Sequence, residues 1–268
     1  PDTMESVTYS SFVTSNSSRT PVVYAGVNDG MLHAFNAVNG QELFAYVPSA
    51  VYKNLPDLAS QSYAHKFYVD GSPTGGDAFY DSAWHTVLVG GLGAGGQGIY
   101  ALDITAPDSF SADKVLWEFT DADDADLGYT YSQPDIVKMN NGVWAAIFGN
   151  GYNNTSADGA ASTTGDAVLY IVNIKTGALI KKITTKAGTA SSPNGLSTAT
   201  PIDVDGDRDA DFIYAGDLQG NLWKFDVSGS NSSQWKVAYG SSGSPQAPFT
   251  AIAPDGSAQP STSRPIVS

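Results

Sequence analysis

Residues 212–226 read Phe-Ile-Tyr-Ala-Gly-Asp-Leu-Gln-Gly-Asn-Leu-Trp-Lys-Phe-Asp, and this pattern indicates the fold. An apolar run ends at Gly216, a short polar turn follows, and a second alternating run starts at Asn221. Alternation with a period of two, broken by turn residues, predicts two antiparallel strands joined by a tight connection. The same pattern occurs three more times, in segments 22–26 with 31–35, 86–90 with 98–103, and 144–149 with 168–172.

The four copies recur at a nearly constant period. Their marker glycines, Gly26, Gly90, Gly149 and Gly216, are 64, 59 and 67 residues apart. A third apolar run follows each pair, and an earlier strand that starts at a small residue or Gln and Pro precedes three of them, at 72–73, 133–134 and 200–201. A repeat of this length filled with strands is typical of propeller blades. The sequence therefore predicts an all-β fold, a β-propeller of four-stranded antiparallel blades with about four blades over residues 21–268.

The ends of the chain are less regular than the repeats. Residues 1–20 are polar and weakly patterned, which predicts a weakly ordered lead-in and leaves the first blade without a preceding strand. Residues 264–267, Arg-Pro-Ile-Val, look like the start of one more blade. They could complete the first blade and close a four-bladed ring, or the chain could be part of a larger propeller, which we favour. We also expect a short helix over 49–59 and a flexible loop over 240–263.

One loop carries a specific chemical pattern. Residues 203–211 read Asp-Val-Asp-Gly-Asp-Arg-Asp-Ala-Asp, which places a carboxylate at every second position. Five such groups on one face of a strand repel one another, whereas a curled loop brings them around a cation. Calcium takes six to eight oxygen ligands, and the spacing matches positions 1, 3, 5, 7 and 9 of a calcium loop. We predict a calcium site formed by the residues at those positions: Asp203, Asp205, Asp207, Asp209 and Asp211.

The expected ligand roles differ along this loop. The side chains of Asp203, Asp205, Asp207 and Asp211 would bind the ion, and Asp209 would contribute its main-chain carbonyl. Position 12, a Glu in helix-flanked calcium loops, is Tyr214 in a strand, so the loop joins two strands. Without that Glu, either Asp211 supplies a bidentate carboxylate or water completes the shell. A second acidic cluster between 121 and 126 has irregular spacing, and we interpret it as a solvated hairpin tip.

Composition excludes several classes of function. The net charge of −14 disfavours nucleic acid and anionic membranes as partners, and the absence of Cys excludes disulfides and thiolate chemistry. No apolar run approaches the roughly 20 residues of a membrane-spanning helix. Gly90 to Gly98 lacks the Lys-Ser/Thr of a phosphate loop, so it reads as a strand connection. No catalytic motif is apparent, and the start of the sequence reads as that of a fragment.

Several motifs together resemble the C-terminal propeller of the type IV pilus tip adhesins of the PilY/PilC type. The resemblance runs from about Val22 to Phe225 and is carried by segments 23–36, 42–48, 68–73, 90–96 and 214–223. It implies a modified seven-bladed propeller, of which this chain would hold about four blades. It also implies a calcium loop at Asp203 to Asp211.

The resemblance implies a non-enzymatic pilus biogenesis factor that supports assembly, opposes retraction in a calcium-dependent way and attaches to surfaces. The implied partners are pilus subunits or minor pilins and a host or surface receptor. The implied location is the bacterial cell surface, at the pilus tip or the outer membrane. Two alternatives stay open: a quinoprotein-like propeller, because segments 34–43 and 172–177 echo its blade repeat, and a generic integrin-like calcium-binding propeller.

Overall fold

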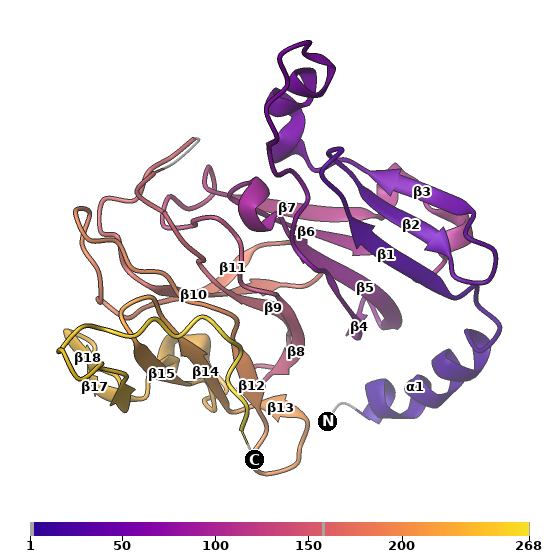
Figure 1. The fold of residues 1–268 in the computed structure, drawn as a ribbon. Helices are drawn as coiled ribbons and strands as arrows, with labels where there is room; N and C mark the ends of the chain where they lie inside the picture. Colours follow the sequence, from indigo (N-terminus) through magenta and orange to yellow (C-terminus); the bar gives the residue numbers. More distant parts are fainter. Residues whose placement is uncertain (1–2, 157–158, 268) are drawn as a thin grey trace.

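The computed structural model describes residues 3–156 and 159–267, and its strands form successive blades around part of a ring (Figure 1). Residues 1–2 of the expected lead-in and residue 268 of the expected propeller lie outside the described residues. The first blade has three strands and the next three blades have four each, in the order of the chain. The first two blades contain β1 (Val22–Gly26), β2 (Leu32–Asn36) and β3 (Glu42–Tyr46), then β4 (Thr74–Tyr80), β5 (Ala83–Gly91), β6 (Gly98–Asp103) and β7 (Val115–Thr120).

The third and fourth blades repeat this meander. Their strands are β8 (Asp135–Met139), β9 (Trp144–Gly149), β10 (Val168–Asn173) and β11 (Leu179–Thr184), then β12 (Thr200–Ile202), β14 (Phe212–Gly216), β15 (Asn221–Asp226) and β16 (Lys236–Val237). Neighbouring strands within the four-stranded meanders are antiparallel. The predicted all-β fold, its four-stranded antiparallel blades and the short first blade are confirmed.

Both faces of a central blade are buried, which explains its almost continuous apolar strands. On β9, Ala145 and Ile147 pack toward the fourth blade, whereas Ala146 and Phe148 pack toward the second. On β10, Leu169 likewise packs toward the fourth blade, whereas Val168 and Tyr170 pack toward the second. Because successive side chains of a strand point to opposite faces, one strand serves two inter-blade cores. The third core lies between the first two blades.

The repeated glycines lie where the chain crosses to the next blade. A Cβ added at Gly26 would be 2.6 Å from the carbonyl oxygen of Val69, and one at Gly149 would be 2.4 Å from that of Leu196. No larger residue fits such a close backbone approach. In the second blade the glycine in this position is Gly91, one residue after the marker in the sequence. The period of the sequence therefore reflects the spacing of the inter-blade crossings.

The N-terminal segment differs from the expected weakly ordered lead-in. Helix α1 (Thr3–Ser15) packs against β5, and a hydrogen bond of 3.0 Å joins the Tyr9 hydroxyl to Asp77. The expected short helix is the 3₁₀ helix η1 (Ser49–Ala59). Further 3₁₀ turns are η2 (Gly93–Gly95), η3 (Pro107–Ser109), η4 (Ala112–Lys114) and η5 (Ser232–Gln234). None of the helices in the described ranges is long and apolar enough to cross a membrane.

The C-terminal segment also differs from its prediction. Instead of one flexible loop, residues 240–263 contain most of the hairpin β17 (Tyr239–Ser241) and β18 (Ser244–Gln246), and β19 (Phe249–Thr250), which pairs with β15. Residues 264–267 form no strand. The Thr200 hydroxyl donates to the carbonyl of Pro265 at 2.7 Å, and Arg264 pairs with Asp135. The segment thus lies beside the inner strands of the third and fourth blades, and among the described residues it does not close a ring at β1.

Candidate metal centre

The acidic loop connects the inner strand of the fourth blade to its neighbour and touches the third blade on the way. After β12 the chain turns through residues 203–208 and forms β13 (Asp209–Ala210), which pairs in parallel with β8. Gly206 and Arg208 have positive φ angles of 84° and 76°, so the loop curls instead of extending. Because β13 extends the sheet of the third blade, the loop is fixed between two blades.

Three of the five predicted residues lie together. Each of Asp203, Asp205 and Asp211 offers a carboxylate oxygen within 4.8 Å of the other two. Asp203 and Asp205 are exposed, whereas Asp211 is 5% exposed. The main chain of Asp211 is hydrogen-bonded on both sides, since its N–H donates to the carbonyl of Ile202 and its carbonyl accepts from the N–H of Val227, both at 2.9 Å. The loop therefore has one rigid acidic group below two that face solvent.

Main-chain donors orient these carboxylates. Asp203 accepts from the N–H groups of Gly206 at 2.7 Å and Arg208 at 2.8 Å, one on each oxygen. These hydrogen bonds favour the charged form and lower the pKa of Asp203 from its ordinary value. Asp211 accepts from the N–H of Val204 at 2.9 Å. The loop thus favours the ionised form of Asp203 and holds the three carboxylates close to one another, which suits a divalent cation.

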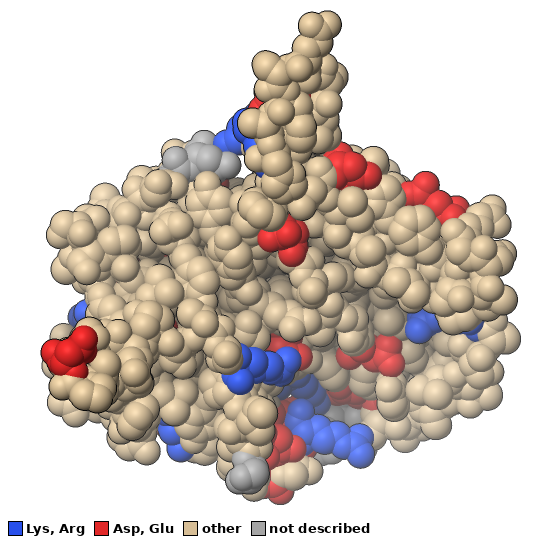
Figure 2. All heavy atoms as spheres, in the orientation of Figure 1, with Lys and Arg blue, Asp and Glu red and all other residues tan. Residues whose placement is uncertain are grey.

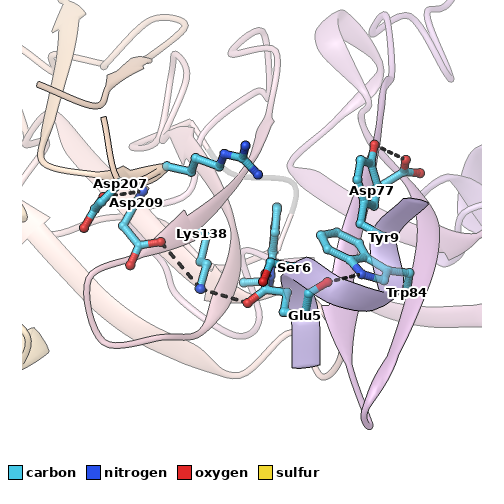
Figure 3. Close-up of a pocket in the computed structure, with 10 residues that line it drawn as sticks. Glu5, Ser6, Tyr9, Asp77, Trp84, Lys138, Asp207 and Asp209 are labelled. Atoms are coloured by element: carbon cyan, nitrogen blue, oxygen red, sulfur yellow. Dashed lines mark hydrogen bonds and ion pairs between the residues drawn. The ribbon is translucent and has the colours of Figure 1, made fainter. Parts of the chain in front are cut away.

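The other two predicted residues lie outside this group. Asp207 accepts from the N–H of Asp209 at 2.8 Å, and its carboxylate does not join the other three. The Asp209 side chain points toward Lys138 of β8, with 3.8 Å between Oδ1 and Nζ (Figure 3). Burial raises the pKa of Asp209, Lys138 opposes that shift, and Asp207 adds to it. The side chain of Asp209 is turned away from the group, which agrees with its expected main-chain role, while the side-chain role of Asp207 has no support in this geometry.

The sequence pattern missed a residue of the third blade. Asn140, in the turn between β8 and β9, donates through Nδ2 to the carbonyl of Ala210 at 2.9 Å and lies 3.3 Å from Asp211 Oδ1. The same amide nitrogen is 3.4 Å from the carbonyl of Val227. Asn140 is 71 residues from Asp211, and a single Asn in a hairpin turn gives no local signal for such a contact.

The acidic cluster near residue 121 is not the solvated hairpin tip that the sequence suggested. Lys182 Nζ lies 2.7 Å from carboxylate oxygens of both Asp124 and Asp126, whose side chains are 16% and 15% exposed. The Tyr170 hydroxyl also donates to Asp124 at 3.0 Å. These acidic groups are neutralised within the protein. Their geometry indicates a structural ion-pair network, because Lys182 occupies the position that a cation would take.

The acidic loop lies in a part of the surface where charges of both signs meet. Figure 2 shows acidic and basic side chains together where β12, β13 and the start of α1 approach one another. A cavity of about 260 Å³ lies in this region, lined by α1, β4, β5, β8, β9 and the acidic loop. The candidate site is therefore next to a junction of several elements, with the N-terminal helix on its far side.

Comparison with known proteins gives a consistent result. The model of the PilY1 β-propeller domain matches residues 2–268. A type IV pilus biogenesis factor PilY1 homolog of Xylella fastidiosa is 47% identical over 265 residues, which cover 95% of this chain and 17% of the relative. The type IV pilus biogenesis factor PilY1 of Pseudomonas aeruginosa strain UCBPP-PA14 is 46% identical over 224 residues, or 82% of this chain and 18% of that protein. The chain thus spans less than a fifth of the length of these relatives.

The structural comparison agrees with the sequence comparison. The crystal structure of the Pseudomonas aeruginosa PilY1 C-terminal domain superposes with a TM-score of 0.82 at 40% identity. The match covers 96% of this chain and 52% of that domain. The predicted resemblance and propeller fold are confirmed, whereas the total of seven blades stays a prediction. The family model over nearly the whole chain, the two relatives and this structure show that the chain belongs to the PilY1 β-propeller domain family.

Proposed function

We propose that this chain is the calcium-binding, non-enzymatic propeller part of a type IV pilus biogenesis factor that supports pilus assembly at the bacterial cell surface. The calcium-bound protein would oppose pilus retraction and favour surface attachment. The observation that carries the calcium proposal is the group of three facing carboxylates of Asp203, Asp205 and Asp211. Membership of the PilY1 family supports the pilus role and favours it over a quinoprotein dehydrogenase.

The chemistry of the donor set fits calcium. The three residues offer six carboxylate oxygens, and the main-chain carbonyl of Asp209 and water can supply further oxygen ligands. None of the ion pairs found in residues 3–156 and 159–267 involves Asp203, Asp205 or Asp211, so their mutual repulsion lacks a basic partner there. A hard divalent cation relieves that repulsion. Magnesium fits less well because it keeps most of its water and prefers few protein ligands.

Calcium at this position would act on the junction between two blades. The loop belongs to the fourth blade, but β13 pairs with β8 of the third, and Asn140 of the third blade contacts the Ala210–Asp211 segment. An ion that fixes the loop would therefore stiffen the contact between the blades. By mass action the stabilisation would reach about 2.7 kcal/mol when free calcium is 100 times the Kd. A stiffer junction would present the loops at that end of the propeller in one arrangement to pilins.

Calorimetric titration of calcium into the 268-residue chain tests the site. Asp205→Asn keeps the size of the side chain and removes one charge of the group. Asp255→Asn is a matched control, because Asp255 also lies in an exposed turn before a glycine with φ near +84°. We expect binding by the unsubstituted chain, a large loss in Asp205→Asn and no change in Asp255→Asn. No heat from the unsubstituted chain, or equal binding by both variants, would refute the site.

The pilus role is tested in cells that produce the full-length protein. Pili on the surface are counted with Asp205→Asn or Asp255→Asn, in cells with active retraction and in cells with retraction disabled. We expect Asp205→Asn to reduce surface pili only where retraction is active, because the calcium-bound form opposes it. An equal loss in both backgrounds would indicate an assembly defect, and no loss in either would refute the calcium-dependent role.

A further inference from the structure

Lys138 lies between the acidic loop and the N-terminal helix. Its Nζ is 2.8 Å from Oε2 of Glu5 on α1 and 3.8 Å from Oδ1 of Asp209 on β13. Figure 3 shows this chain of charges, from Asp209 through Lys138 to Glu5. The Lys138 side chain is only 10% exposed and that of Glu5 only 9%, so water screens their interaction weakly. A change in the position or charge of Asp209 or Glu5 therefore alters the electrostatic environment of Lys138.

Hydrogen bonds and ring contacts hold the helix that carries Glu5. The Trp84 ring donates to the Glu5 main-chain carbonyl at 3.0 Å, and the Trp144 ring donates to Glu5 Oε1 at 2.8 Å. Tyr9 packs against Trp84 with ring centroids 4.5 Å apart. Val7 is 71% exposed, so the helix does not bury a continuous apolar face. Glu5 and Tyr9 thus help to dock α1 on the rings of Trp84 and Trp144, and a cavity of about 260 Å³ lies beside the helix.

The strand pairing gives this arrangement a mechanical connection as well as an electrostatic one. In the parallel pairing of β13 with β8, Asp209 is the register partner of Lys138. Two residues after Asp209 comes Asp211, the buried member of the carboxylate group. A shift of the loop on binding an ion is thus transmitted directly to the strand that carries Lys138, and a shift of Lys138 is transmitted back to the loop.

We propose that calcium binding at the acidic loop and docking of helix α1 favour each other through Lys138. The proposal rests on the calcium site proposed above. When α1 is docked, Glu5 neutralises the buried ammonium group. When α1 is displaced, the ammonium group loses the charge of Glu5, and its positive charge then repels an incoming cation at the acidic loop more strongly. Because linkage is reciprocal, bound calcium must strengthen docking by the same factor.

The proposal is tested by calcium titration of Glu5→Gln. Glutamine keeps the shape of the side chain and an acceptor for Trp144, and it removes the charge that neutralises Lys138. Couplings between sites are commonly 5- to 150-fold, and we expect the calcium Kd to rise about tenfold. Glu42→Gln is the matched control, because Glu42 lies on β3 of the first blade and pairs with His33. We expect its Kd to stay within twofold of that of the unsubstituted chain.

A second measurement follows the helix itself. Hydrogen exchange of the amides of residues 3–15 should slow on addition of calcium to the unsubstituted chain, and this slowing should be weaker in Glu5→Gln. If Glu5→Gln does not fold, Tyr9→Phe removes the hydrogen bond to Asp77 and loosens α1 without touching Lys138. It should also raise the Kd.

The outcomes separate the two proposals. Equal Kd values in Glu5→Gln and Glu42→Gln, with helix exchange unaffected by calcium, would overturn the linkage and leave the calcium site intact. Absence of calcium binding by the unsubstituted chain would overturn both. A raised Kd in Glu5→Gln together with slower helix exchange in the calcium-bound chain supports the linkage.

Discussion

Replacement of Asn140 by Ala should weaken both the propeller and its proposed calcium site. The amide nitrogen of Asn140 makes its shortest contact, 2.9 Å, with the carbonyl of Ala210, and it lies 3.3 Å from Asp211 Oδ1. An NH₂ group has two hydrogens, so it can serve these two acceptors at once, and the carbonyl of Val227 is a more distant third acceptor at 3.4 Å. In Asn140→Ala both acceptors lose the Asn140 donor, and the third blade loses this side-chain contact with the Ala210–Asp211 segment.

The size of the effect follows from these two hydrogen bonds. A neutral hydrogen bond contributes about 0.5–1.5 kcal/mol, and one to a charged group about 1.5–3 kcal/mol. Solvent can reach part of this region, so we expect a loss of about 2 kcal/mol in the free energy of unfolding without calcium. At about 2–4 °C per kcal/mol for a domain of this size, Tm should fall by roughly 4–8 °C. Loss of a residue that orients a metal ligand commonly costs about 10- to 100-fold in affinity, and we expect about tenfold for calcium.

Thermal unfolding in the presence of a chelator and calorimetric titration with calcium measure the two effects separately. Asn141→Ala is the control, because Asn141 lies in the same turn and its side chain accepts from the N–H of Val143, at 3.1 Å, within that turn. A calcium Kd that changes equally in the two variants would refute the role of Asn140 in orienting Asp211. An unchanged Tm in Asn140→Ala would refute the estimate of its structural contribution.

Three further predictions follow from contacts described in the structure. Asp207→Asn should weaken calcium binding much less than Asp205→Asn in the same titration, because only Asp205 belongs to the carboxylate group; equal losses would show that Asp207 turns inward when the ion binds. Asp217 is fully buried, and one of its oxygens accepts from Trp223 Nε1 at 2.8 Å among other donors. Asp217→Asn should therefore lower the free energy of unfolding, measured by urea denaturation, by about 3 kcal/mol, and a loss below about 1 kcal/mol would contradict this role of the carboxylate. Burial opposes protonation of His33, but its contacts with Glu42 and Asp29 raise its pKa overall. The stability that the charged His33 contributes is therefore full below about pH 6.5 and is lost as pH rises through the raised pKa. The Tm difference between the unsubstituted chain and His33→Gln should shrink from pH 6 to pH 9, and a constant difference would exclude the ion pairs.

The repeat was predictable because the strands and turns of each blade have a recognisable pattern in a continuous stretch of sequence. The predicted ranges of β6, β9, β14 and β15 agree with the structure to the residue, since alternation and turn glycines mark both ends. Helix α1 was not predictable in this way. Its sequence is rich in Ser, Thr and Val, which have modest helix propensity, and its stability comes from contacts of Glu5 and Tyr9 with rings far along the chain.

The candidate site was predictable in part for the same reason. The alternating carboxylates of residues 203–211 are adjacent in sequence, so a local pattern finds them. Which of them face one another depends on the curl at Gly206 and on the pairing of β13 with β8. The residues that support the loop, Lys138 and Asn140, come from another blade. Only the folded arrangement brings them to the loop.

The parallel pairing of β13 with β8 has a consequence for how the chain folds as it is made. The inner edge of the third blade receives its last strand from a segment about 70 residues further along, as the separation of Asn140 from Ala210 shows. At about 5–20 residues per second, a ribosome needs on the order of 10 s to supply that segment. During this delay the unpaired edge of β8 is open to pairing with other nascent chains. Chaperone protection of the β8 edge during synthesis would therefore limit such mispairing.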